Sequence, residues 1–133
     1  MLQKVNNIDI RNVNVLVLAY LGDNIYEYYV RKFLINKNIA NVNDLQKNAV
    51  NYVSAVNQAK YIKELLDNNF FTEEELDVIR RARNHKSGHP KSCDIITYKY
   101  ATALEAVIGF LELSENRGRI EEIMSNILGG SIC

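Results

Sequence analysis

Hydrophobic residues along this chain recur at the three- and four-residue spacing of helices, and no segment of convincing length alternates as a strand would. The stretch from about Asn12 to Asn36 is apolar nearly all round, which is typical of a central helix that other helices surround. Asn12 or Asn14 can cap its first turn. A second largely apolar helix, IITYKYATALEAVIGFLEL, is predicted to follow Asp94 as its cap.

Shorter helices are predicted around these two. One helical region begins at Asn43 and continues, after a kink, through VSAVNQAKYIKELL. The segment FFTEEELDVIRRAR begins with a capping box, because Thr72 is followed three residues later by Glu75 and acids fill the first turn. Asn116 opens a short last helix, which Gly129 and the glycine after it stop.

Length and composition support one folded domain. A chain of 133 residues can bury a core without disulfides, and 47% hydrophobic with 24% charged residues is ordinary for a globular protein. We therefore expect residues 1–133 to form a single domain with an all-α fold, a helical bundle. The two cysteines make neither a metal motif nor a disulfide framework. A signal-peptide pattern and a membrane-spanning apolar run are both missing from the sequence, so we expect a cytoplasmic protein without membrane contact.

Two carboxylates interrupt the two apolar helices, and each has small residues beside it. Asp23 follows Gly22 in the first helix, and Glu105 has Ala101 and Gly109 one turn before and one turn after it. A glycine inside a helix costs about 1 kcal/mol relative to alanine, so a compensating role is expected. Small residues let helices pack closely. We therefore expect the two helices to cross here and to bring Asp23 and Glu105 together.

Several arrangements would accommodate such a pair of acids. Two carboxylates about 4 Å apart would repel by roughly 4 kcal/mol at an effective dielectric constant near 20, unless they share a proton, flank a Lys or Arg, or hold a hard divalent cation such as Mg²⁺. The structural alternative is that each acid caps a neighbouring helix or pairs with Arg31 or Lys99, and periodicity alone slightly favours it. Glu27 could bind an outer-sphere water, but its spacing from Arg31 favours an ion pair.

A basic segment follows the capped helix. The formal net charge of the chain is zero, yet RRARNHKSGHPKSC, residues 80–93, contains five Lys or Arg, two His and no acid. Gly88 and Pro90 break the helix, so we expect this run to project as a loop. It could simply complement the negative end of the helix dipole. Beside an acidic metal site, it suggests instead a phosphodiester substrate.

Five segments, LAYLGDNIYEYYVR, YVSAVNQA, FFTEEE, RARNHKS and YKYATALEAVIGFLEL, resemble Mini-ribonuclease III (Mini-III) in order and spacing along nearly the whole chain. Mini-III is the ribonuclease III branch that lacks a double-stranded-RNA-binding domain. The resemblance implies an Mg²⁺-dependent endoribonuclease that works on double-stranded RNA as a homodimer. It further implies trimming of the stem formed by the ends of the 23S ribosomal RNA precursor, leaving 5′-phosphate and 3′-hydroxyl ends. A ribosomal protein is a candidate helper.

The resemblance also assigns residues. Asp23 falls on the signature Asp of the family's Gly-Asp motif and Glu105 on the metal-binding Glu of its Glu-Ala motif, which implies catalytic and metal-binding roles for both. Ordinary ribonuclease III has two more acids where this chain has Ala19 and Thr102, a departure similar to the Mini-III branch that leaves fewer direct ligands. The segment RARNHKS looks like the family's RNA-contacting loop, which gives an RNA-binding role to Arg81, Arg83, Asn84, Lys86 and Ser87.

Two other classes of protein compete with this interpretation. The first is a non-catalytic module that binds double-stranded RNA or the ribosome as a helical dimer, for which loss of Asp23 or Glu105 would be typical; both are present. The second is a purely helical dimerisation protein, which would not need the basic segment.

Overall fold

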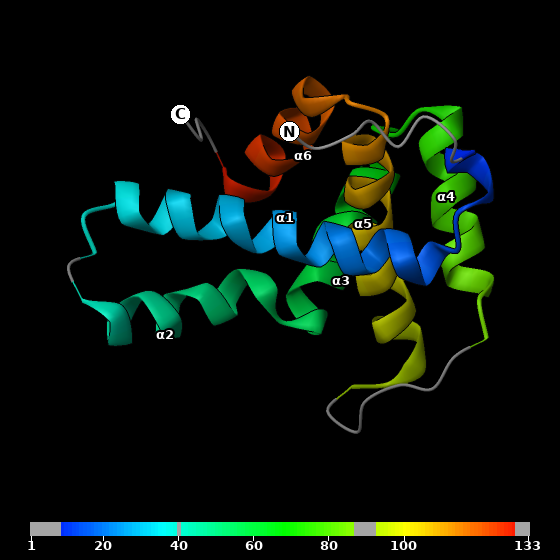
Figure 1. The fold of residues 1–133 in the computed structure, drawn as a ribbon. Helices are drawn as coiled ribbons and strands as arrows, with labels where there is room; N and C mark the ends of the chain where they lie inside the picture. The colour runs from blue at the N-terminus through cyan, green and yellow to red at the C-terminus, as the bar shows by residue number, and fades with distance from the viewer. Residues whose placement is uncertain (1–8, 40, 87–92, 130–133) are drawn as a thin grey trace.

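The computed structural model describes residues 9–39, 41–86 and 93–129, and this part of the chain is helical apart from its connections. A short 3₁₀ turn, η1 (Ile10–Asn12), precedes six α-helices (Figure 1). The prediction of an all-α single domain is confirmed. The helices are α1 (Val15–Asn36), α2 (Val42–Val53), α3 (Ala55–Asp67), α4 (Glu73–Asn84), α5 (Ile95–Leu113) and α6 (Arg117–Leu128).

Polar caps begin α1, α4, α5 and α6 where the sequence predicts them, whereas α2 begins just before the predicted Asn43, with Asn41 as its cap. Asn14, rather than Asn12, caps α1, because its side chain accepts the backbone N–H of Leu16. Thr72 and Glu75 form the predicted capping box of α4. Asp94 and Asn116 cap α5 and α6 in the same way. These caps satisfy backbone donors that would otherwise have no partner in the first turn of each helix.

The predicted kink in the second helical region is a complete break at Ser54. The residue has an extended backbone that ends α2, and its hydroxyl accepts the backbone N–H of Asn57 to start α3. A serine at this position competes well for a cap, because its side chain can replace a helical hydrogen bond. The chain therefore turns there, and α3 leaves α2 to pack against α5.

The central helix of the bundle is α5, which packs against α1, α3, α4 and α6 (Figure 1). Every residue from Ala101 to Leu111 is buried except Glu105, which is partly buried. The expectation that other helices surround the first apolar helix is wrong for the single chain. One face of α1 stays exposed, and it carries Val17, Tyr20, Tyr28 and Ile35.

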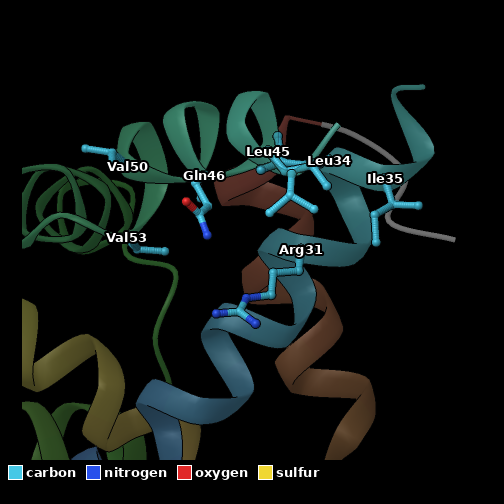
Figure 2. A pocket seen from close by; sticks show the side chains of 9 residues that line it. Arg31, Leu34, Ile35, Leu45, Gln46, Val50 and Val53 are labelled. Carbon is cyan, nitrogen blue, oxygen red and sulfur yellow. The ribbon is translucent and has the colours of Figure 1, made fainter. Parts of the chain in front are cut away.

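The second half of α1 and α2 form an arm that is packed more loosely than the bundle. None of the twelve residues of α2 is buried. The Tyr26 hydroxyl donates a hydrogen bond of 2.7 Å to the backbone carbonyl of Tyr52 and so ties the base of the arm together. Beyond it, an open groove separates the two helices, and Figure 2 shows its lining residues Arg31, Leu34, Ile35, Leu45, Gln46, Val50 and Val53.

None of the described helices combines the length and the hydrophobicity that crossing a membrane requires.

Candidate active site

The helices α1 and α5 cross with their backbones in contact. A Cβ atom added to Gly22 would lie 1.7 Å from the carbonyl oxygen of Glu105, and one added to Gly109 would lie 1.9 Å from that of Leu18. Both distances are far below a van der Waals contact, so only glycine fits at either position. The prediction of a close helix crossing at Gly22 and Gly109 is therefore confirmed.

This crossing brings Asp23 and Glu105 together. The pKa of Glu105 is raised to about 9, first by burial and then by the hydrogen-bonding contact and the negative charge of the Asp23 side chain. A hydrogen bond from Gln58 opposes these effects, and the charge of Glu27 adds to them slightly. At neutral pH the free protein therefore holds a proton on Glu105, which corresponds to the shared-proton arrangement among those considered.

The expectation that both carboxylates are buried is correct only in part. Glu105 is partly buried, whereas Asp23 is exposed on the surface of α1. The reason is the crossing itself: Gly22 faces α5, so the next residue along α1 points away from the interior. Desolvation therefore acts mainly on Glu105, and Asp23 remains accessible to solutes.

Among the described residues, no Lys or Arg forms an ion pair with Asp23 or Glu105. Arg31 pairs instead with Glu27, at 3.6 Å between Nη2 and Oε2, which confirms the interpretation of Glu27 as an ion-pair partner. The structural alternative, in which Arg31 or Lys99 neutralises the two acids, is therefore wrong for this part of the chain.

The sequence analysis missed one neighbour of Glu105. Gln58 of α3 is buried, with 3% of its surface exposed, and its Nε2 donates to Oε2 of Glu105 at 3.4 Å. Its position was detectable in principle. Gln58 shares the buried stripe of α3 with Ile62 and Leu65, at spacings of four and three residues, so it is a polar residue at a core position.

A second carboxylate in the bundle, Glu75, has a different environment. Its side chain is 3% exposed and accepts hydrogen bonds from Nε and Nη2 of Arg119 at 2.8 and 2.9 Å. The same guanidinium donates to the backbone carbonyl of Phe70 and lies over the Phe70 ring. Glu75 therefore has a cationic partner held in a fixed geometry, and we regard it as structural.

The two carboxylates at the crossing fit a hard divalent cation. Mg²⁺ is commonly bound through one or two carboxylates, while water and phosphate oxygens complete its shell. Ala19 and Thr102, which stand where ordinary ribonuclease III has acids, are buried and offer no carboxylate. Within the described residues, no group of three or more His, Cys, Asp or Glu side chains converges. Within the part of the chain that the structure describes, Asp23 and Glu105 are therefore the pair of carboxylates placed to hold the ion.

The basic residues predicted to contact RNA have unequal surroundings. Arg81 is partly buried, and its Nη2 donates to the backbone carbonyl of Val13 at 2.8 Å. Arg83 is exposed, and its guanidinium lies 4.3 Å from the centre of the Tyr100 ring. Asn84 and Lys86 are exposed. The remaining predicted residue, Ser87, lies outside the described residues.

A second cation, which the sequence analysis missed, lies over the Tyr100 ring. Lys63 of α3 places its Nζ 4.8 Å from the centre of the Tyr100 ring, so a second positive charge lies beside that of Arg83. Stacking on an aromatic face orients a cation without neutralising it. Basic side chains from α3 and α4 therefore meet beside α5, on a chain whose net charge is zero.

Comparison with known proteins bears on what this arrangement does. A family model described as "Ribonuclease III domain" matches residues 16–116. Mini-ribonuclease 3 of Brevibacillus brevis is 49% identical over 112 residues, which cover 84% of this chain and 82% of that protein. Mini-ribonuclease 3 of Staphylococcus aureus is 39% identical over 120 residues, which cover 90% of each chain.

A solved structure gives the same result. The crystal structure of a Fusobacterium nucleatum protein superposes with a TM-score of 0.83 and 34% sequence identity, and the match covers 92% of this chain and 99% of that one. The resemblance noted in the sequence and the helical fold expected from it are thus confirmed. The chain belongs to the Mini-ribonuclease 3 family, whose members are ribonuclease III-type endoribonucleases.

Proposed function

We propose that this chain is an Mg²⁺-dependent endoribonuclease that cleaves double-stranded RNA in the cytoplasm, and that it matures the stem formed by the ends of the 23S ribosomal RNA precursor. The family implies a divalent metal ion. The observation that carries the proposal is the pair of carboxylates at the α1–α5 crossing, which has no cationic partner among the described residues.

In this proposal, Asp23 and Glu105 would hold the cation, and Glu105 would have to give up its proton to do so. When bound, Mg²⁺ would supply activation of a water for in-line attack on phosphorus and would offset the charge that develops on the phosphate oxygens. Asp23, being exposed, is accessible to a duplex. Arg83 and Lys86 contact phosphates, which positions the duplex without specifying its sequence. The products carry 5′-phosphate and 3′-hydroxyl ends.

A homodimer is part of the proposal, because one site reaches one strand and a duplex has two. Support comes from the exposed face of α1. Tyr20 is 84% exposed and Val17 56%, and with Tyr28 and Ile35 they form one helical stripe. A two-fold contact through this stripe would cover it in both copies. Sedimentation at micromolar concentration should give twice the 15.3 kDa chain mass, and a fully active monomer would remove the two-strand argument.

The test of the function uses charge-neutral replacements at the crossing. Asp23→Asn and Glu105→Gln should each abolish cleavage of a long RNA duplex in Mg²⁺ while retaining fold and duplex binding. Glu112→Gln is the matched control, because Glu112 lies on the same helix and pairs with Arg117 at 3.4 Å, away from the crossing. A near-normal single-turnover rate in either test variant would overturn the assignment.

The competing non-catalytic module makes a different prediction for the unmodified protein. It would bind duplex RNA in Mg²⁺ and in EDTA alike and would cleave it in neither. The ribosomal substrate requires a separate comparison, in which the precursor stem should be cut at defined positions and a generic duplex of equal length should be cut at no preferred position. The ribosomal protein helper stays a prediction, to be tested by adding ribosomal proteins to the same reaction.

A further inference from the structure

The side chain of Gln58 lies opposite Glu105 because of the register between two helices. Gln58 of α3 contacts Glu105 of α5; five residues further along α3, Lys63 contacts Tyr100, five residues earlier in α5. The two helices therefore run antiparallel with a fixed register, and they pack closely along their length. Since Gln58 is 3% exposed, its amide cannot exchange its partner for bulk water without moving α3.

The chemistry of this residue suits a neighbour of a metal ligand. Its amide donates a hydrogen bond to one oxygen of the Glu105 carboxyl group but adds no positive charge, so it does not compete with a cation at that group. A Lys or Arg in the same place would neutralise Glu105, as Arg119 neutralises Glu75. A Leu would fill the space but leave the carboxylate oxygen without a donor.

We propose that Gln58 is a positioning residue of the metal site, which holds Oε2 of Glu105 and leaves the other carboxylate oxygen to the cation. This inference rests on the proposed role of Glu105. Hydrogen bonds to a ligating carboxylate fix its orientation, and removing them typically weakens metal binding about 10- to 100-fold. The effect should be pronounced here, because Ala19 and Thr102 supply no further carboxylates and, among the described residues, two proposed ligands share the task.

The experiment measures binding of Mn²⁺ alone, without RNA, from the electron paramagnetic resonance signal of the free ion. Gln58→Met keeps the length of the side chain and removes the donor. Ile62→Met is the matched control, because Ile62 is fully buried one turn later on the same face of α3. We expect the Gln58 variant to bind Mn²⁺ about 10- to 100-fold more weakly and the Ile62 variant to bind it as the unmodified protein does.

Cleavage and melting give the second readout. A positioning role predicts that Gln58→Met needs more metal for half-maximal cleavage but approaches the normal rate at saturation, with a melting temperature in EDTA close to that of Ile62→Met. If Gln58→Met does not fold, Gln58→Ala, which cannot clash, replaces it. Normal Mn²⁺ affinity in the folded Gln58 variant would overturn the inference.

A further variant separates this inference from the function on which it rests. Glu105→Gln should lose Mn²⁺ binding. If that variant binds Mn²⁺ normally, the metal site itself is misassigned, and both proposals fail. If it loses binding while Gln58→Met retains it, Glu105 remains a ligand and only the role of Gln58 is wrong.

Discussion

Glu75 and Glu105 are both carboxylates inside the bundle, and they are held in opposite ways. Glu75 is 3% exposed and receives two hydrogen bonds from Arg119. Glu105 has another carboxylate, Asp23, and an uncharged amide, Gln58, as its neighbours. Glu75 is positioned by its charged partner. The backbone of Glu105 is positioned by its contact with Gly22, which is independent of any charge on the side chain.

The difference shows how one fold separates a structural acid from a functional one. An ion pair that is mostly buried is expensive to break, because removal of one partner leaves an uncompensated charge. A carboxylate without a cation is instead free to take one from solution, provided that something else fixes its place. In this chain Gly22 and Gly109 fix the place of the Glu105 backbone, because they let α1 and α5 cross in contact.

The largest effect should come from moving Glu105 by its backbone. Gly22→Ala places a methyl group against the carbonyl of Glu105, where no rotamer change gives relief, so we expect a loss of more than about 3 kcal/mol or failure to form the native bundle. Gly118→Ala is the control, because nothing lies within 4 Å of an added Cβ there. Urea denaturation measures both, and a native-like Gly22 variant would refute the backbone argument.

A smaller loss of folding stability is expected when Glu75 loses its partner, Arg119. Arg119→Met should lower stability by about 3 kcal/mol, at the lower end for a buried pair, because it leaves a buried carboxylate unpaired while the guanidinium it removes is 15% exposed. The double variant Arg119→Met with Glu75→Leu should recover much of this stability, since both charges are then gone. Chemical denaturation of the single and double variants tests the idea. Equal stability of the two would mean that the guanidinium acts by packing on Phe70 rather than by its charge.

The next largest effect is the dependence of folding stability on pH, which should distinguish Glu105 from Glu75. The pKa of Glu105 rises from an ordinary 4.5 to about 9 on folding. Between these values the folded chain holds one more proton than the unfolded chain, so in EDTA its contribution to stability declines as pH rises, by at most about 1.4 kcal/mol per pH unit.

Two variants isolate this contribution when urea denaturation is repeated at pH 5.5, 7 and 8.5. Glu105→Gln should remove the decline, because an amide does not titrate in this range. Glu75→Gln should lower stability throughout and leave the decline in place. A decline that persists in Glu105→Gln would assign it to another group.

The smallest effects concern the basic residues, which again divide into one that is bound within the protein and others that are exposed. The Arg81 guanidinium donates a hydrogen bond to the backbone carbonyl of Val13, whereas Arg83 and Lys86 are exposed. Arg83→Ala and Lys86→Ala should each lower the slope of log affinity against log salt by roughly 0.7 to 0.9, with little change in melting temperature. Arg81→Ala should instead lower the melting temperature and leave the salt slope unchanged. The reverse pattern would show that Arg81 is the phosphate contact.

Most of the fold could be predicted, because its signals are local. Caps such as Asn14, Thr72 and Asp94 satisfy backbone groups two or three residues away, and both the donor and the acceptor can be identified in the sequence. The break at Ser54 was anticipated only as a kink. The flanking residues are good helix formers, and only the packing of α3 on α5 shows that the chain must turn there.

The candidate site could be predicted in its outline. Asp23 and Glu105 were identifiable as charges within apolar stretches, and the glycines beside them indicated the crossing. The exposure of Asp23 and the contact between Gln58 and Glu105 could not be predicted, because both depend on which face of one helix meets another. The engagement of Arg81 with a carbonyl 68 residues earlier is equally non-local.

The contact between the backbones at Gly22 and Gly109 also sets the order in which the molecule opens. Backbone amides around the crossing can exchange their hydrogens with solvent only when two central helices separate, which approaches global unfolding. Amides of α2, a helix without a buried residue, need only the arm to move. The arm can therefore fluctuate and admit water into its groove while the spacing between Asp23 and Glu105 stays constant.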